Sequence, residues 1–202
     1  MPQATQQLLE THQQVQALVN AGDLDAAVQL TEQWVTVTDR ALALEWLVQC
    51  RVRRDGVPAA LAAVEQNLQR PELPGPVRGC LSAIVAMYRL PVLPFGSWAS
   101  RSLTPDELSA LELAEVGMRL SAPDVRWAPC ALAVARALQG RGDEARSLAQ
   151  QVLSRPTGPV QERGWMIAVL GMCDGDPAHL DELRRLDPGN RLLPALEASV
   201  RH

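Results

Sequence analysis

The chain has 202 residues, of which 47% are hydrophobic and 21% are charged, and its net charge is −4. This length and composition are typical of one folded unit. All 19 basic residues are arginines, so the chain contains no lysine, which excludes lysine-dependent phosphate loops, Schiff-base lysines and Ser-x-x-Lys nucleophile pairs. The negative charge argues against a nucleic-acid partner, and no apolar run approaches the roughly 20 residues of a membrane span.

The first residues and the cysteines indicate a reducing environment. Residues 1–16 are polar and rich in Gln, and they lack the basic start and apolar core of a secretory signal. Cys50, Cys80, Cys130 and Cys173 are 30, 50 and 43 residues apart, which matches neither a zinc knuckle nor a disulfide-stapled domain. We therefore expect a cytoplasmic protein with reduced, buried cysteines. Abundant Ala, Arg and Leu beside scarce Lys, Ile and Asn indicate a GC-rich, bacterial-like composition.

Helical periodicity runs through nearly the whole chain. Apolar residues recur at positions i, i+3, i+4 and i+7 in two clear stripes. The first contains Leu24, Ala27, Val28, Thr31, Trp34 and Val35, and the second contains Ala145, Leu148, Ala149, Val152 and Leu153. No run of alternating β-branched residues indicates a strand. The sequence therefore predicts an all-α protein.

Glycines and prolines divide this helical pattern at a nearly regular interval. Gly22 and Gly56 are 34 residues apart, and Gly142 and Gly175 are 33 apart. Prolines follow the last three of these glycines by 15, 14 and 13 residues, where each would end a second helix. We expect a single domain over residues 1–202, with five helix pairs at 4–38, 39–71, 77–120, 124–156 and 160–187 and a capping helix at 189–201.

The third pair contains an irregular insertion at residues 91–103, which follows a helix that ends near Leu90. Thr104 has the pattern of an N-cap, with Pro105 in the first turn and Glu107 closing a capping box, so the next helix begins there. The insertion is too apolar for a free linker and includes Phe95 and Trp98. Two alternatives remain open: the insertion packs back on the helices, or it offers Phe95 and Trp98 to a partner.

Three segments carry a family resemblance: Asn20-Ala-Gly-Asp-Leu-Asp-Ala-Ala27, Gly140-Arg-Gly-Asp-Glu-Ala145 and Leu186-Asp-Pro-Gly-Asn190. They resemble the turn, the second-helix alanine and the repeat-closing loop of the tetratricopeptide repeat family. Trp46 and Trp165, each 10 residues before its turn glycine, are similar to that family's leading-helix tryptophan. Over nearly the whole chain, the resemblance implies a divergent right-handed α-α superhelix. A generic antiparallel helical bundle is the alternative.

The resemblance also implies a concave binding face formed by the leading helices. The residues expected there are His12, Gln16, Trp46, Arg53, Arg54, Arg136, Trp165, Val169 and Met172. Trp and Met would supply apolar contact area, and Arg would bind carboxylates. Alternatively, the two tryptophans belong to the core between repeats, and the arginines at 51–54 are a solvated helix end that offsets the helix dipole. The lysine-containing carboxylate clamp of one family subset is disfavoured here, although Arg could replace the charge.

No constellation of catalytic residues is evident. His12 and His179 lie near opposite ends of the chain, and there is no His-Glu-x-x-His, Gly-x-Ser-x-Gly or paired-cysteine zinc motif. Asp174-Gly-Asp176 lacks the remaining ligands of a calcium loop and is better explained as a turn. We therefore expect no enzyme, no metal and no cofactor.

These observations favour a cytoplasmic scaffold that binds a peptide or partner protein through its concave face. The alternatives are a regulatory or sensor module for a small ligand or signalling peptide and, less favoured, a helical enzyme with a cryptic site. An open groove would favour the scaffold, and a discrete pocket near the third helix pair would favour the sensor. The oligomeric state and the partner's identity stay open.

Overall fold

All regular structure in the described part of the chain is helical, which confirms the predicted all-α class. The structure is a computed structural model that describes residues 3–37, 41–123, 125–155 and 160–200. Its helices are α1 (Gln3–Ala21), α2 (Leu24–Val37), α3 (Ala41–Asp55), α4 (Val57–Leu68), α5 (Gly75–Arg89), α6 (Pro105–Leu120), α7 (Trp127–Leu138), α8 (Gly142–Leu153), α9 (Val160–Asp174), α10 (Pro177–Leu186) and α11 (Leu193–Val200). The expected boundaries at 38, 39, 124, 156 and 201 lie outside the described residues.

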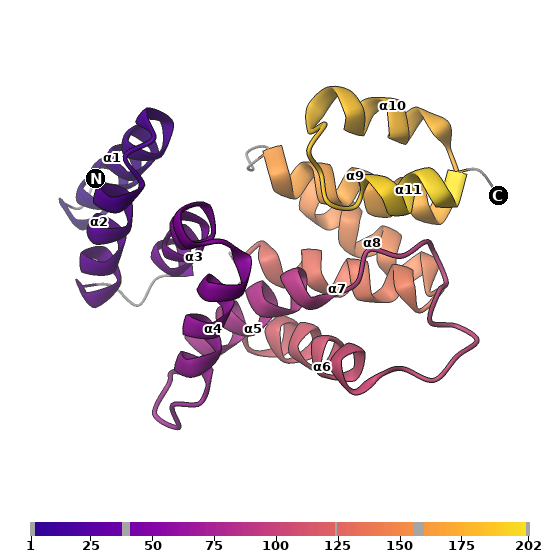
Figure 1. Cartoon of the computed structure of the whole chain (residues 1–202), viewed down its shortest axis with the longest axis horizontal. Coiled ribbons are helices and arrows are strands. Elements are labelled where there is room, and N and C mark those ends of the chain that lie inside the picture. The colour runs from indigo at the N-terminus through magenta and orange to yellow at the C-terminus, as the bar shows by residue number, and fades with distance from the viewer. Residues whose placement is uncertain (1–2, 38–40, 124, 156–159, 201–202) are drawn as a thin grey trace.

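The helices pack in chain order, with a second set of contacts between alternate helices. Each even-numbered helix contacts the odd-numbered helix on either side of it. In addition, α3 contacts α5, α5 contacts α7, α7 contacts α9, and α9 contacts α11. Figure 1 shows α1 and α2 at one end of the molecule and the group α9 to α11 at the other. The odd-numbered helices from α3 onward therefore form a connected inner row.

The turns between paired helices depend on glycines that adopt positive φ. Gly22, Gly56 and Gly175 have φ values of 79°, 83° and 66°, a region that side chains with a Cβ rarely occupy. In the fourth pair this residue is Gly140, with φ of 76°, whereas Gly142 is the first residue of α8. The turn glycine is therefore Gly140, two residues before the expected Gly142. Both glycines of Gly140-Arg-Gly142 fit the sequence pattern, and only the backbone φ angle shows which of them makes the turn.

The buried apolar residues form two clusters, a small one at the N-terminal end of the chain and a large one over the rest. The small one joins α1, α2 and α3 through Val15, Ala27, Val28, Trp34, Ala43 and Cys50. The large one extends from α3 to α11 and includes Trp127, Trp165 and Leu196. Cys50, Cys80 and Cys130 are buried as expected, whereas Cys173 is half-buried, and all four are free thiols. No helix within the described ranges has the length and apolar character needed to cross a membrane.

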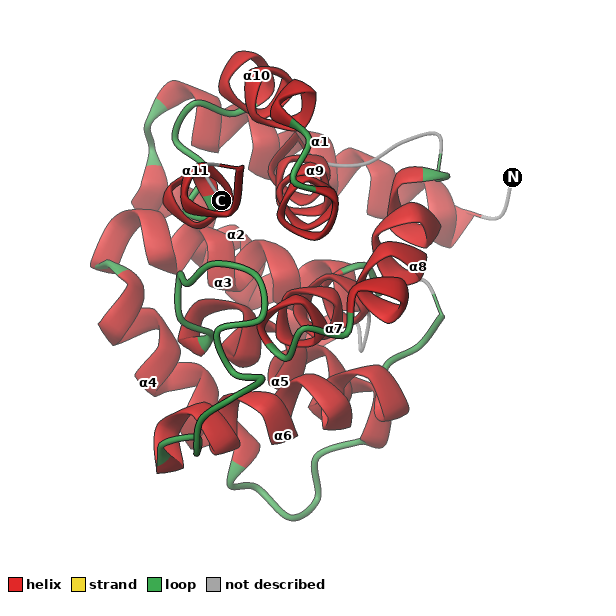
Figure 2. Cartoon of the chain, turned by 90° about the vertical axis from the view of Figure 1, so that its right-hand side faces the viewer, coloured by secondary structure: helices red, strands yellow, loops and turns green. Residues whose placement is uncertain are grey.

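The insertion between α5 and α6 packs on the helices, as the first of the two alternatives left open by the sequence expects. The backbone N–H groups of Gly96 and Trp98 donate to the α7 carbonyls of Ala137 and Leu138 at 2.9 and 2.7 Å. These carbonyls belong to the last turn of α7, where the helix supplies no i+4 N–H donors to accept from. The Trp98 side chain is 5% exposed. Figure 2 shows this loop against α7 on the face that also carries α11.

The start of α6 confirms the expected N-cap. The Thr104 hydroxyl accepts a hydrogen bond from the Glu107 backbone N–H, and the Glu107 carboxylate accepts from the Thr104 N–H at 2.9 Å. The same carboxylate accepts from the Trp98 indole at 3.1 Å and from the Arg101 guanidinium. Together these bonds hold the Glu107 pKa near 2, well below its ordinary value. Glu107 therefore fixes the insertion to the beginning of α6.

Candidate functional site

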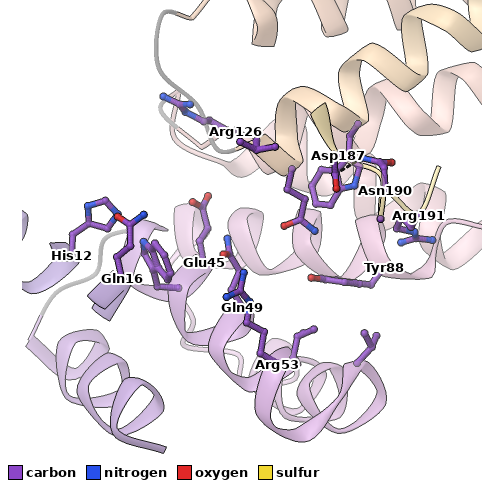
Figure 3. Close-up of a pocket in the computed structure, with 17 residues that line it drawn as sticks. His12, Gln16, Glu45, Gln49, Arg53, Tyr88, Arg126, Asp187, Asn190 and Arg191 are labelled. Carbon is purple, nitrogen blue, oxygen red and sulfur yellow. Dashed lines mark hydrogen bonds between the residues drawn. The ribbon is translucent and has the colours of Figure 1, made fainter. Parts of the chain in front are cut away.

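A cavity of about 1040 Å³ lies on the inner side of the odd-numbered helices. Its wall contains residues from α1, α3, α5 and α9, the first residue of α4, the residue before α7, and the loop between α10 and α11. Figure 3 shows the labelled α1 and α3 side chains on one side of the cavity and those of Arg126 and the α10–α11 loop on the other. The lining residues are His12, Gln16, Glu45, Trp46, Gln49, Val52, Arg53, Val57, Tyr88, Arg126, Val160, Gln161, Trp165, Asp187, Gly189, Asn190 and Arg191.

Helical spacing explains how single helices present several of these side chains together. On α3 the lining residues Gln49, Val52 and Arg53 follow Glu45 by four, seven and eight residues, which is one or two helical turns, so they lie on the same side of the helix as Glu45. His12 and Gln16 on α1 are likewise four residues apart, as are Gln161 and Trp165 on α9. The wall is therefore built from one face of each helix.

Aromatic rings form three contacts at or behind the cavity wall. The His12 ring centroid lies 5.4 Å from that of Trp46, which is half-buried, so this pair links α1 to α3. On the other side, Trp127 lies behind the wall and contacts both Tyr88 at 5.9 Å and Trp165 at 4.9 Å, the latter edge to face. Trp165 is 1% exposed. Trp46 thus offers ring surface to the cavity, whereas Trp165 is chiefly a core residue.

Asn190 and Arg191 of the α10–α11 loop are held by hydrogen bonds. Asn190, 5% exposed, donates to the Asp187 carboxylate at 2.9 Å and accepts from the Leu192 N–H at 2.9 Å. Arg191 donates to the carbonyls of Met87 and Leu90 at the end of α5. A cation at a helix C-terminus is electrostatically favourable, and these bonds satisfy otherwise unpaired carbonyls. The loop is thereby fixed in position as part of the wall.

The absence of a side chain at Gly164 lets α9 approach this loop. A Cβ at that position would lie 2.7 Å from the Asn190 side-chain nitrogen and 3.0 Å from an Asp187 carboxylate oxygen. Both distances are shorter than ordinary Cβ contacts. Gly164 is therefore required for the close packing that forms this corner.

The arginines around the cavity differ in whether a carboxylate balances their charge. Arg51 donates to Glu32 at 2.6 Å, and Arg54 donates to Asp55 at 2.7 Å. In contrast, Arg53 forms no hydrogen bond or ion pair with any side chain in the described ranges. Sequence reasoning treated these arginines as one group, but the structure separates a cavity-lining Arg53 from its paired neighbours.

Five of the residues expected on the concave face come together at the cavity: His12, Gln16, Trp46, Arg53 and Trp165. Arg54 and Arg136 do not line it. Arg136 is held near Glu115 at 3.1 Å and Glu144 at 3.3 Å, at the far end of α7, so ion pairs occupy its guanidinium. These two arginines are structural contacts rather than cavity residues.

Val169 and Met172 lie in the core instead of on the cavity wall, with 0% and 3% exposure. Their half of α9 is covered by the C-terminal helices, since a Cβ on Gly171 would lie 2.6 Å from Leu196 and 2.8 Å from His179. The family resemblance indicated the correct helix, but the covering of α9 by the C-terminal helices could not be predicted from it. Phe95 and Trp98 of the insertion are half-buried and buried, respectively, and lie outside the cavity.

Several wall residues were missed by sequence reasoning. Gln49 and Gln161 could have been found, because each lies four residues from another lining residue on the same helix. Tyr88, the chain's single tyrosine, and the residues Asn190 and Arg191 had no such signal. Arg191 reaches α5 across more than a hundred residues of sequence, so its position depends on tertiary packing.

The cavity wall offers hydrogen-bonding groups and charge. Four of its residues are amides, namely Gln16, Gln49, Gln161 and Asn190, and each amide can both donate and accept. Within the described ranges, His12 has no carboxylate partner, and no three His, Cys, Asp or Glu side chains converge as metal ligands. His179 lies 3.9 Å from Asp174 outside the cavity. No protein-family model, curated protein or solved structure matches the chain.

Proposed function

We propose that the protein is a non-enzymatic, tetratricopeptide-like interaction module that binds an extended peptide segment of a partner protein in this cavity. The observation that carries the proposal is a cavity of about 1040 Å³ whose wall combines residues of the odd-numbered helices α1, α3, α5 and α9 with the α10–α11 loop. A right-handed superhelix of five helix pairs is the arrangement we propose for this row. Its leading helices would then supply the binding face.

The chemistry of the wall supports a peptide as the occupant. A peptide backbone alternates N–H donors and C=O acceptors, and the side-chain amides of Gln16, Gln49, Gln161 and Asn190 carry both functions. The half-buried Trp46 offers an apolar surface for a peptide side chain. Arg53, free of ion pairs with the described chain, offers a positive charge. The wall thus combines backbone pairing, an apolar anchor and a charge.

Peptide capture tests this proposal. The full-length protein is incubated with peptides obtained by proteolysis of the source cell's proteins, and the retained peptides are identified by mass spectrometry. We expect a defined set whose capture falls when Gln49 and Gln161 are both replaced by Ala. The matched control replaces Gln66 and Gln150, which are exposed on α4 and α8 outside the cavity. Equal capture by the two double variants would contradict the proposal.

A small-molecule sensor is the second candidate, and the size of the cavity favours it. The volume of about 1040 Å³ is close to the upper end of the roughly 300–1,000 Å³ typical of small-ligand pockets. Tyr88, in the third helix pair, is part of the wall. Under this alternative, the small-molecule fraction of a cell extract raises the Tm of the protein and the peptide pool does not. The peptide module predicts the reverse result.

A further inference from the structure

Glu162 lies next to Arg126, a cationic residue of the cavity wall, but outside the cavity itself. The Arg126 side chain is 25% exposed, and its Nη1 lies 3.8 Å from the Glu162 carboxylate oxygen Oε2. That oxygen is buried and has no hydrogen-bond partner within the described chain. Figure 3 shows Arg126 on the side of the cavity opposite the labelled side chains of α1 and α3. A ligand in the cavity would therefore meet Arg126, with the buried carboxylate beside it.

The ionisable groups that act on Glu162 lie at the helices packed against α9. Arg126 precedes α7 and Arg155 follows α8, and both favour the ionised carboxylate. Cys130 of α7 faces the same carboxylate, and burial raises the pKa of its thiol well above the ordinary value, so the thiol stays neutral. The charge of Glu45 on α3 also acts on Cys130. Within the described chain, no charged group of α10 or α11 acts on Glu162.

The proton on Glu162 controls how far this carboxylate offsets the charge of Arg126. Burial raises the Glu162 pKa to about 7, while the charges of Arg126 and then Arg155 oppose that effect. Glu162 is therefore partly protonated at neutral pH. An anion placed at Arg126 from the cavity would bring a second negative charge near Glu162 and favour its protonated form. Proton binding at Glu162 and anion binding at Arg126 would thus strengthen each other.

We propose that Arg126 binds a carboxylate of the bound peptide and that Glu162 takes up a proton from solvent as the peptide binds. This inference rests on the proposed function and adds the peptide chemistry that the cavity recognises. A guanidinium group matches a carboxylate in geometry as well as in charge. Glu162 acts through Arg126, because a protonated Glu162 no longer competes for the guanidinium. The affinity for the peptide is therefore highest below pH 7 and falls as the pH rises through 7.

Peptide libraries with at most one ionisable group test the pH dependence. All are degenerate in non-ionisable residues and acetylated at the N-terminus. The neutral library has a central Asn and an amidated C-terminus, the second has a central Asp and an amidated C-terminus, and the third has a central Asn and a free C-terminus. The full chain is incubated with each at pH 6 and pH 9. We expect a carboxylate library to be retained about tenfold more at pH 6, which corresponds to about 1.4 kcal/mol of coupling. The neutral library should be retained equally at both pH values.

Four variants identify the residues that carry this effect. Glu162→Gln should retain the preferred carboxylate library equally at pH 6 and pH 9, because it cannot change charge. Arg126→Gln should lose the preference for that library over the neutral one, whereas Arg185→Gln, at an exposed position on α10 outside the cavity, should keep it. An imidazole also changes charge in this pH range, so His12→Gln is the control for the pH response and should keep it. A pH response that persists in Glu162→Gln, or one that disappears in His12→Gln, overturns the inference.

Calorimetry on the parent protein keeps the inference testable where a variant does not fold. The carboxylate peptide that the parent retains most strongly is titrated at pH 7.5 in two buffers with different enthalpies of ionisation. We expect an uptake of about half a proton per bound peptide. Proton release on binding, or no exchange of protons, overturns the inference.

The two carboxylate libraries distinguish the sources of the carboxylate. An Arg126-dependent preference for the Asp library assigns the carboxylate to an acidic side chain, and the same preference for the free C-terminus assigns it to the end of the peptide. Both results support the inference. Equal retention of all three libraries overturns the inference and leaves the proposed function in place. Retention of none of them overturns both.

Discussion

At the scale of single residues, the most unusual group is Glu162, a buried carboxylate in the first turn of α9. Its side chain is 4% exposed, and one of its oxygens has no hydrogen-bond partner. Arg126 lies 3.8 Å from that oxygen, near enough for electrostatic attraction but too far for a hydrogen bond. Burial therefore outweighs the attraction of Arg126 and Arg155 and raises the Glu162 pKa to about 7.

This pKa makes stability depend on pH in a defined direction. The folded protein holds the Glu162 proton to about pH 7, whereas the unfolded chain releases it near its ordinary value of 4.5. The contribution of protonated Glu162 to the free energy of unfolding is therefore complete below the unfolded-state pKa of 4.5. It is lost as the pH rises through 7, the pKa in the folded protein. Because each pKa unit corresponds to about 1.4 kcal/mol, Glu162→Gln should gain about 2 kcal/mol of unfolding free energy over the parent between pH 5 and pH 8.

Urea unfolding at the two pH values measures this gain. Glu112→Gln, at an exposed position on α6, is the control and should follow the parent at both pH values. A stability difference between Glu162→Gln and the parent that stays the same at pH 5 and pH 8 would contradict the account.

Gly164 supplies a second prediction at this scale. Gly164→Ala places a Cβ 2.7 Å from the Asn190 side chain, so the α10–α11 loop must shift and unfolding should become easier by about 1–3 kcal/mol. Gly189→Ala, in the same loop, meets no atom within 4 Å and should be nearly neutral. Thermal unfolding of both variants checks this, and equal Tm losses would show that the loop adapts freely.

At the scale of elements, local signals were sufficient to predict the helices. The stripe containing Ala27, Val28, Thr31 and Trp34 is buried, as its spacing required. The Thr104 capping box could be predicted because all of its groups lie within four residues. The burial of Val169 could not, since α9 is packed against α7, α8, α10 and α11, and no local pattern encodes these contacts.

The insertion at 91–103 leads to a prediction about an element without periodicity. Trp98 is 5% exposed and belongs to the large apolar cluster, so the segment acts as core. Trp98→Ala should lower the unfolding free energy by about 3–5 kcal/mol, the usual cost of truncating a buried tryptophan. Ser100→Ala, at an exposed position of the same segment, should have little effect. Denaturant unfolding that gave the two variants similar midpoints would refute a core role.

At the scale of the whole molecule, the candidate site depends on distant segments that meet in space. His12 and Arg191 are at opposite ends of the chain, yet both line one cavity. The sequence could indicate Trp46 and Arg53 through their positions on α3, but the opposite wall required the packing of α9 and the α10–α11 loop. The site residues that the sequence predicted are those that follow from helical spacing, and the residues that it missed are those placed by tertiary contacts.

The absence of lysine determines which side chain supplies positive charge to the cavity. It removed several kinds of catalysis from consideration, and it leaves Arg as the side chain that can place a permanent positive charge in the cavity. Of the three cavity arginines, Arg191 also secures the end of α5, while Arg53 is free of ion pairs with the described chain. Charge at the cavity thus serves both structure and the binding that we propose.

Photo-crosslinking from inside the cavity tests the central claim most directly. A photoreactive amino acid replaces Gln161, which is exposed on the cavity wall, and in a second variant it replaces Gln150, which is exposed on α8 outside the cavity. Both proteins are illuminated in extracts of the source cell, and the crosslinked segments are sequenced by mass spectrometry. The account predicts that position 161 labels defined peptide segments of partner proteins and that position 150 does not. Identical labelling from the two positions, or no protein labelled from position 161, would contradict it.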